Sequence, residues 1–310
     1  MSMEITTAFV KQFEDNVTML AQQRGSRLRG LLRETNLTGV SVFMDQIGPT
    51  QALRTNSRHA DSPLVNTPHA RRRIGAINVE WGDLIDDFDK LSMIINPESE
   101  YAQNAAWAIG REIDDIIFEK FFADAYVGQE GNQTVSFPSS QSIDGTINEG
   151  EISGATSSDS TVSGLNVDKL QYARELLQSN EVDLDMETPV IAVPAKALTR
   201  DLLSIERATS QDFASVRALA QGQIDTFMGI RFVQSERVPT DSNGNFLCPM
   251  WVPSGMGLAV RKNPTARITE RSDKRFSTYV YYSTSVGASR LEEEKVVQVP
   301  VHPTNGASTS

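Results

Sequence analysis

Histidine, serine and aspartate residues gather in one short stretch of the sequence, SRHADSPLVNTPHARRRIG at residues 57–75. It contains two of the three histidines of the chain, His59 and His69, with Ser57 and Asp61 close by. Serine, histidine and aspartate are the residue types of a hydrolytic relay, and paired histidines are common zinc ligands. The stretch therefore raises two chemical hypotheses, a hydrolase site and a metal site.

The spacing argues against both. Ser57, His59 and Asp61 alternate, so in a strand they share one face, whereas a relay joins residues from distant segments. His59 and His69 have no third soft ligand nearby, and the only cysteine, Cys248, sits in the apolar run FLCPMWV and is interpreted as a small buried hydrophobe. The G-x-S-x-G elbow and the Gly-rich phosphate loops are absent. We predict no catalytic residue, no metal and no cofactor, and interpret the stretch as pairing with a neighbouring surface.

The charge of the chain is unevenly distributed. The net charge is −11, yet residues 1–76 contain ten Lys/Arg against six Asp/Glu. A basic head on an acidic body could bind nucleic acid or the acidic body of a sister subunit. No apolar run is long enough to span a membrane, and the start of the chain has no apolar signal-peptide core. We expect no membrane association and no export.

The elements that position the His59 region are two extended runs. GVSVFMDQIG and RRRIGAINVEW are β-rich, and a polar connection with three prolines lies between them. A connection of about 20 residues is unusual inside a compact domain, so we expect it to reach out and pack on something else. In a strand, Arg71 and Arg73 would point one way and Arg72 the other. Two acidic runs could pair with them, DLIDDFD, which contains Asp86 and Asp87, and Glu292–Glu294.

A very long helix is predicted at residues 98–126, after Pro97. Its apolar stripe runs along Tyr101, Ala105, Ile109, Ile113, Ile116, Ile117 and Phe121. Asp114 and Asp115 diverge by about 100° on such a helix, so they do not converge on a substrate. Residues 127–165 are rich in Gly, Ser and Thr and are interpreted as a surface excursion with one weak hairpin around VSF.

A second folded block follows at residues 166–262. NVDKLQYARELLQSN predicts a helix, PVIAVP a short buried strand and AKALTRDLLSIERA another helix. The Asn243-Gly244 pair predicts a hairpin between GIRFVQSERVP and NFLCPMWVP. The end of the chain, through residue 301, is β-rich, and residues 302–310 are predicted to be a flexible tail.

The order of several segments resembles a known family. FEDNVTMLAQQRGSRLRGLLR, MDQIGPT, SRHADSPLVNTPHARRR, WGDLIDDFDKL, INPESEYAQNAAWAIGREIDDIIFEKFF and GMGLAVRKNPTARITERSDKRFSTYVYYSTSVGASRLEEEKVVQV occur in an order similar to that of the major capsid proteins of tailed bacteriophages. The resemblance covers roughly residues 9–126 and 166–300. It implies an α+β fold of the Hong-Kong-97 type.

The resemblance also names the parts. Residues 1–38 would be the N-arm, 39–80 the extended E-loop, 81–165 the first part of the P-domain with the spine helix at 98–126 and the surface excursion at 127–165, 166–262 the A-domain, and 263–301 the returning antiparallel P-domain strands. It implies hexamers and pentamers that close into an icosahedral shell around double-stranded DNA. Expected contacts between subunits involve Phe43, His59, Asp61, His69, Arg71, Arg72, Arg73, Asp86 and Asp87. Interior or DNA-facing positions are Arg24, Arg27, Arg29 and Arg33.

Partners follow from the same resemblance. We expect self-association, a separate scaffolding protein, a portal protein at one vertex, a cement or decoration protein, and packaged DNA bound without sequence specificity. The virion is the expected location, after synthesis in the bacterial cytoplasm. Some relatives link an E-loop lysine to an asparagine of a neighbour, but residues 39–80 contain no lysine. We therefore predict a shell held by non-covalent contacts.

Three alternatives stay open from sequence alone. One is an encapsulin-like nanocompartment shell with an enzyme cargo. Another is a hydrolase that uses His59 and Asp61. The third is a DNA-binding module led by Arg24, Arg27, Arg29 and Arg33, although an acidic body is a poor general DNA binder.

Overall fold

The computed structural model describes residues 22–54, 62, 64–85, 98–147, 162–202 and 225–302. The chain forms two units: one comprises Met1–Ser26, Asn78–Glu112 and Lys262–Ser285, and the other comprises Arg27–Ile77, Ile113–Arg261 and Val286–Ser310. We call them unit 1 and unit 2. Within the described ranges, no helix is long and apolar enough to cross a membrane.

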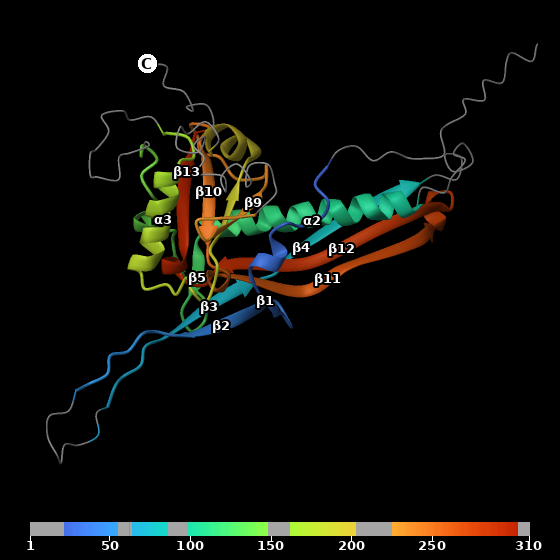
Figure 1. Cartoon of the computed structure of the whole chain (residues 1–310). Helices are drawn as coiled ribbons and strands as arrows, with labels where there is room; N and C mark the ends of the chain where they lie inside the picture. The colour runs from blue at the N-terminus through green and yellow to red at the C-terminus, as the bar shows by residue number, and fades with distance from the viewer. Residues whose placement is uncertain are drawn as a thin grey trace, which may run out of the picture. The chain divides into compact units, whose positions relative to one another are not determined.

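A five-stranded sheet forms the centre of unit 2 (Figure 1). Its strands, in spatial order, are β13 (Val296–Val301), β10 (Phe246–Trp251), β7 (Val190–Val193), β9 (Ile230–Gln234) and β8 (Thr226–Phe227). All four residues of β7 are buried, as its continuous apolar run predicts. Cys248 is also fully buried, which confirms its interpretation as a hydrophobe, and burial raises the pKa of its thiol.

The hairpin predicted at Asn243-Gly244 is confirmed close to the turn, where Thr240 and Phe246 form an antiparallel bridge and Leu247 N donates to Pro239 O at 2.9 Å. A tight turn does form, because Asp241 N donates to Asn245 O at 2.9 Å and Gly244 has a φ of 82°. However, β9 and β10 do not pair with each other, because β7 lies between them, parallel to β9 and antiparallel to β10. The division at residue 262 also differs from the strand pairing, because β13 pairs with β10 and not with the other returning strands.

Helix α3 (Val167–Ser179) confirms the helix predicted at the start of the second block. Its N-cap is Asn166, whose side chain accepts a hydrogen bond from the backbone N of Lys169 at 2.7 Å. Leu170, Ala173 and Leu177 are buried, as their spacing predicts. The next predicted helix is described only at its start, where Ala197–Asp201 forms a π-helical turn.

The second sheet of unit 2 contains the reaching hairpin. Its strands, in spatial order, are β2 (Ser41–Ile47), β3 (His69–Gly75), β5 (Ala125–Val127) and β6 (Gln133–Val135). Strands β2 and β3 pair antiparallel from Ser41–Gly75 to Ile47–His69, which confirms the two extended runs. The described residues between them, 48–54, 62 and 64–68, contain no helix or strand.

The third sheet has the order β1 (Arg33–Asn36), β11 (Met256–Arg271), β12 (Ser277–Arg290) and β4 (Ile77–Ile85). Strand β1 runs parallel to β11 and pairs with Gly257–Val260. Short helical turns complete the described elements: η1 (Arg29–Leu31), η2 (Ser139–Gln141), η5 (Pro253–Gly255), η6 (Ser272–Lys274) and η7 (Glu293–Lys295).

Helix α2 (Glu98–Phe122) is the predicted long helix, but it ends at Phe122 and not at residue 126. Residues Ala125–Val127 leave the helix and form strand β5. Ala105 and the four isoleucines of the predicted stripe are buried, together with Phe121. Asp114 and Asp115 diverge as predicted: Asp114 accepts from the backbone of Arg27 and Leu28, whereas Asp115 pairs with Arg237.

The interpretation of residues 127–165 as a surface excursion agrees with the exposed β5–β6 turn but is wrong for the described residues from Gln141 onward. Strands β5 and β6 form a hairpin, as the VSF pattern suggested. After it, Gln141, Ile143 and Leu165 are buried. Ile143 N donates to Gln298 O at 3.0 Å, so this segment packs beside β13. Residues 148–161 lie outside the described part.

Candidate subunit interface

The β2–β3 hairpin has two faces of different character. Directly opposed residues of paired strands share a face. One face carries Val42, Met44, Gln46, Ala70, Arg72 and Ile74, and the other carries Phe43, Asp45, Ile47, His69, Arg71 and Arg73. The register therefore confirms that Arg71 and Arg73 point one way and Arg72 the other. We call these the inner face and the outer face of the hairpin.

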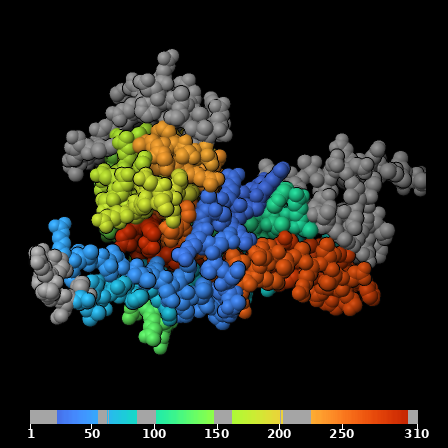
Figure 2. Space-filling model, turned by 60° about the horizontal axis from the view of Figure 1, so that its bottom comes forward, coloured from blue at the N-terminus to red at the C-terminus, as the bar shows by residue number. Residues whose placement is uncertain are grey.

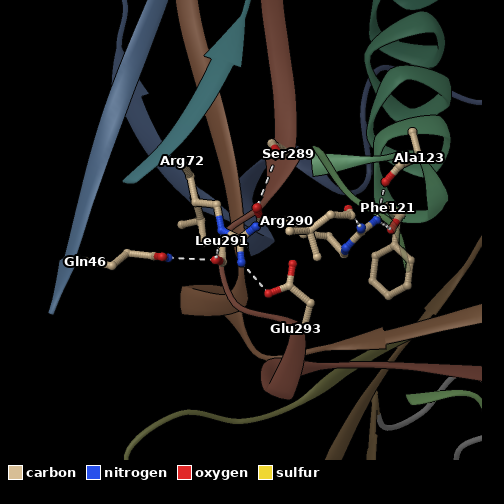
Figure 3. Close-up of polar contacts among 9 residues, drawn as sticks. Gln46, Arg72, Phe121, Ala123, Ser289, Arg290, Leu291 and Glu293 are labelled. Carbon is tan, nitrogen blue, oxygen red and sulfur yellow. Dashed lines mark hydrogen bonds and ion pairs between the residues drawn. The ribbon is translucent and has the colours of Figure 1, made fainter. Parts of the chain in front are cut away.

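The inner face is attached to the rest of unit 2. Ile74 is buried in a cluster with Leu37, Ala259 and Leu291, and Val42 and Met44 pack against it. Arg72 Nε donates to Leu291 O at 2.8 Å, and Gln46 Nε2 donates to the same oxygen at 2.7 Å (Figure 3). Both strands of the hairpin are thus held to one backbone carbonyl.

Arg72 also forms an ion pair with Glu293, in turn η7 (Figure 3). The side chains of Arg72 and Glu293 are 9% and 16% exposed, so water screens the pair only weakly. The Glu292–Glu294 run was identified from the sequence as a candidate acidic partner of the arginines. The ion pair between Arg72 and Glu293 confirms this partner within the chain. In the single chain, the register turns the Arg72 side chain inward and Glu293 neutralises its charge.

The outer face is open to solvent. Arg71 Nε donates to Asp45 Oδ1 at 2.6 Å, and the hydrogen bond from Arg71 lowers the pKa of Asp45. The Arg71 guanidinium also lies 5.3 Å from the centre of the Phe43 ring. Phe43 is 37% exposed and Ile47 72% exposed. A cation beside an aromatic ring, next to exposed aliphatic residues, has the composition found at protein interfaces.

Arg73 lies on the same face but closer to strand β5. Its guanidinium is 5.0 Å from the centre of the Tyr126 ring. Gly131, in the β5–β6 turn, has a φ of 66°, and a Cβ there would lie 2.8 Å from Arg73 Cβ. Glycine is therefore required at this turn for both its backbone conformation and the space taken by Arg73. The exposed His69 begins β3.

The hairpin continues beyond its strands with further exposed apolar residues. Leu53 is 62% exposed and Leu64 is 97% exposed. Figure 2 shows the described atoms of this segment, in blue and cyan, extending from the base of the hairpin. His59 and Asp61 fall outside the described residues, as do Asp86 and Asp87, so their predicted contacts have no structural test here.

The N-terminal arginines have partners of their own. Arg24 lies 5.3 Å from the centre of the Trp107 ring in unit 1. In unit 2, the Arg27 guanidinium donates to Gln234 O, and Arg29 Nε lies 3.0 Å from Glu34 Oε1. Arg33 is exposed in β1. Arg24, Arg27 and Arg29 thus each contact a different element.

Two buried cations were missed by the sequence analysis. Arg290 is fully buried, and its guanidinium donates to Phe121 O at 2.6 Å, to Ala123 O and to Val135 O at 3.0 Å (Figure 3). Lys169 is fully buried, and its Nζ donates to Ser163 O and Pro300 O, each at 2.8 Å. Groups of three or more potential metal ligands are absent from the residues that the structure describes.

Comparison with known proteins agrees with a surface built for assembly and not for catalysis. The model of a family described as phage capsid protein matches residues 5–302, so the chain belongs to that family. It is therefore a structural protein of the capsid shell of a phage virion, and not an enzyme, which removes the hydrolase alternative. No curated protein sequence matches the chain.

Solved structures show the same fold at low sequence identity. The capsid of Ralstonia phage GP4 aligns with a TM-score of 0.69 and 10% identity, covering 97% of this chain and 98% of that one. The capsid structure of cyanophage P-SCSP1u aligns with a TM-score of 0.67 and 16% identity, covering 94% and 93%. A protein of Mycobacterium phage Che8 aligns with a TM-score of 0.63 and 15% identity, covering 94% of this chain and 97% of that one. The α+β fold of the Hong-Kong-97 type is thus confirmed.

Proposed function

We propose that the chain assembles into hexamers and pentamers of an icosahedral shell, in which the β2–β3 hairpin lies over an adjacent copy. The observation that carries this is the outer face of the hairpin together with its continuation, where Ile47, Leu53 and Leu64 expose large apolar side chains. Hairpins that expose apolar residues on a lone subunit promote association. A sister subunit would cover them.

The names of the parts follow as proposals. Residues 1–38 act as the N-arm, 39–80 as the E-loop, 81–165 and 263–301 as the P-domain, and 166–262 as the A-domain. The pairing of β13 with β10 supports counting Val296–Val301 with the A-domain sheet instead. We further propose that the shell encloses double-stranded DNA, is made in the bacterial cytoplasm, and forms with a separate scaffolding protein, a portal protein at one vertex and a cement protein.

The hairpin contact is tested with Ile47→Ser combined with Leu64→Ser. Because both side chains are largely exposed in the single chain, we expect the urea unfolding midpoint of the monomer to be unchanged. Assembly, followed by light scattering and electron microscopy, should be lost. Met186→Ser is the matched control, since Met186 is 82% exposed but belongs to the connection between α3 and β7 and not to the hairpin. Normal shells from the double variant would contradict the proposed role of the hairpin.

The absence of lysine from residues 39–80 gives a second test. We expect mature particles, boiled in detergent, to run as a single monomer band on a denaturing gel, because the E-loop offers no amine for an isopeptide bond. Ladders of covalent oligomers would refute non-covalent closure.

A further inference from the structure

The sheet of β1, β11, β12 and β4 has one basic edge and one acidic edge within unit 1. Strand β11 presents Lys262 and Arg267 at one edge, and β4 presents Glu80 and Asp83 at the other. All four side chains belong to exposed residues. Among the described residues, β1 is the only strand on the outer side of β11, and it pairs only as far as Val260.

The hydrogen bonds across the sheet assign these charges to faces. Lys262 Nζ donates to Ser283 Oγ, and Ser285 Oγ donates to Asn78 Oδ1 at 2.8 Å. Ser283 and Ser285 are two residues apart, so they share a face, and Lys262 and Asn78 lie on it with them. Glu80 follows Asn78 by two residues and lies on that face too.

Arg267 and Asp83 lie on the opposite face, because each is an odd number of residues from Lys262 and Glu80 respectively. Over Lys262–Arg267, each face of the sheet therefore has one cation at the β11 edge, and over Glu80–Asp83 each face has one anion at the β4 edge. Glu270 and Arg271 lie farther along β11, where Arg271 pairs with Asp273. Such an arrangement is self-complementary between copies placed side by side.

The strand directions fit the same arrangement. Ser285 contacts Asn78, whereas Tyr279 lies against Gly82, where a Cβ would collide with its hydroxyl. Residue numbers thus rise along β4 as they fall along β12, so these strands are antiparallel. Strands β11 and β12 are joined by the tight connection η6 and are antiparallel as well. Strands β4 and β11 therefore run in the same direction, and β1 already pairs parallel to β11 on its outer edge.

We propose that β4 of one copy pairs with the outer edge of β11 in the next copy, beyond Val260, with Glu80 opposite Lys262 and Asp83 diagonal to Arg267. This inference rests on the proposed shell assembly and identifies one of its contacts. In parallel register, Glu80 opposite Lys262 places Asp83 opposite Thr265, which is two residues from Arg267. Diagonal neighbours of this kind are about 7–8 Å apart, within reach of an arginine side chain.

The contact joins two different edges, so it is head-to-tail and generates rings when the rotation between copies closes. The backbone would supply most of the attraction, and the charges would set partner, direction and register. Exposed charges are screened by salt, with a Debye length of about 3 Å at 1 M. Assembly should therefore require more protein at 1 M salt than at 0.1 M.

Charge reversal at each edge tests the contact. The acid-edge variant is Glu80→Lys with Asp83→Lys, and the base-edge variant is Lys262→Glu with Arg267→Glu. Either turns two attractive pairs into repulsive ones, so the protein concentration needed for assembly should rise by about tenfold or more. The fourfold variant, which carries all four changes, restores complementarity and should assemble within about threefold of wild type, the rest reflecting the Lys262–Ser283 hydrogen bond.

A mixture of the two edge variants gives a second readout. The acid-edge variant has two basic edges and the base-edge variant has two acidic edges, so copies of one variant repel each other. When copies of the two variants alternate, every contact joins a basic edge to an acidic edge. Alternation is compatible with a ring of six and not with a ring of five. The mixture should therefore form hexamers and open sheets or tubes, but no closed shells, in electron micrographs.

Three controls separate folding, net charge and the proposed function. Circular dichroism checks that every variant is folded. Glu130→Lys with Glu175→Lys makes the same change in net charge as the acid-edge variant, at exposed positions outside β4 and β11, and should assemble like wild type. Edge variants that assemble like wild type, or a fourfold variant no better than the edge variants, would overturn the edge contact. Failure of the wild-type chain to assemble would count against the shell function itself.

Discussion

Arg290 and Arg71 are cations of the same unit with opposite surroundings. Arg290 is fully buried and hydrogen-bonded to three backbone carbonyls, within 5.3 Å of the Phe137 ring centre. Arg71, on the outer face of the hairpin, has a 40% exposed side chain paired with the 70% exposed Asp45. Arg290 is part of the buried core, whereas Arg71 lies on a face that is exposed to solvent in the single chain.

Arg72 lies between these extremes and shows how the two regions are joined. Its side chain is 9% exposed, and its partners are Leu291 O and Glu293. The hairpin is therefore held firmly at its base and exposed further out. A fixed base would hold the orientation of the hairpin on its own subunit. Its exposed outer part would then be free to pack against another subunit.

The largest expected effect is at Arg290. We predict that Arg290→Met destabilises the monomer by about 3–5 kcal/mol, because it leaves the buried carbonyls of Phe121, Ala123 and Val135 without their donor. Urea unfolding followed by circular dichroism measures the change. Arg33→Met, at an exposed position in β1, is the matched control and should leave stability unchanged. Equal stabilities of the two variants would contradict the description of Arg290 as part of the core.

A smaller effect is expected at the base of the hairpin. We predict that Arg72→Met costs about 2–3 kcal/mol, since it removes the hydrogen bonds to Leu291 O and Glu293 and takes from the Glu293 carboxylate its cation. Hydrogen exchange should become faster across β2 and β3 in this variant. Arg71→Met, one residue away on the outer face, should change neither unfolding nor exchange measurably, because its ion pair is exposed. Similar behaviour of the two variants would remove the distinction between the faces.

Much of this contrast was predictable from local patterns. The period of two in the RRR run separated Arg72 from Arg71 and Arg73, and the Glu292–Glu294 run was recognised as a candidate partner. Apolar spacing predicted the long helix, and β-rich runs predicted the hairpin strands. The resemblance to phage capsid proteins supplied the fold.

The remainder depends on contacts between residues far apart in sequence. Arg290 and Val135 are 155 residues apart, and no local spacing signals their hydrogen bond. The Gly/Ser-rich composition of residues 127–165 indicated a surface excursion, yet Phe137 stacks near Phe121 and Phe122 and Ile143 is buried. The hairpin predicted at Asn243-Gly244 forms only next to the turn, as far as Pro239 and Leu247. Farther from the turn, β7 lies between β9 and β10, an arrangement that only tertiary packing decides.

The smallest predicted effect, when counted per pH unit, concerns the pH dependence of stability set by the buried Lys169. Burial of Lys169 lowers the pKa of its ammonium group from 10.5 to about 7. Between pH 7 and 10.5 the unfolded chain therefore binds a proton at this residue that the folded chain does not. Stability must then rise with pH across this window, by at most about 1.4 kcal/mol per pH unit from this group. Below pH 7 both states hold the proton, and the contribution is constant.

Lys169→Met should remove this slope, because it replaces the titrating group with an apolar side chain of similar length. The measurement is the free energy of unfolding of the monomer in urea at pH 7, 8 and 9, for wild type and variant. Lys196→Met is the control, since Lys196 is an exposed lysine of the same unit and should leave the slope in place. Parallel pH profiles for wild type and Lys169→Met would mean that Lys169 keeps its proton in the folded chain, stabilised by Ser163 O and Pro300 O despite its burial.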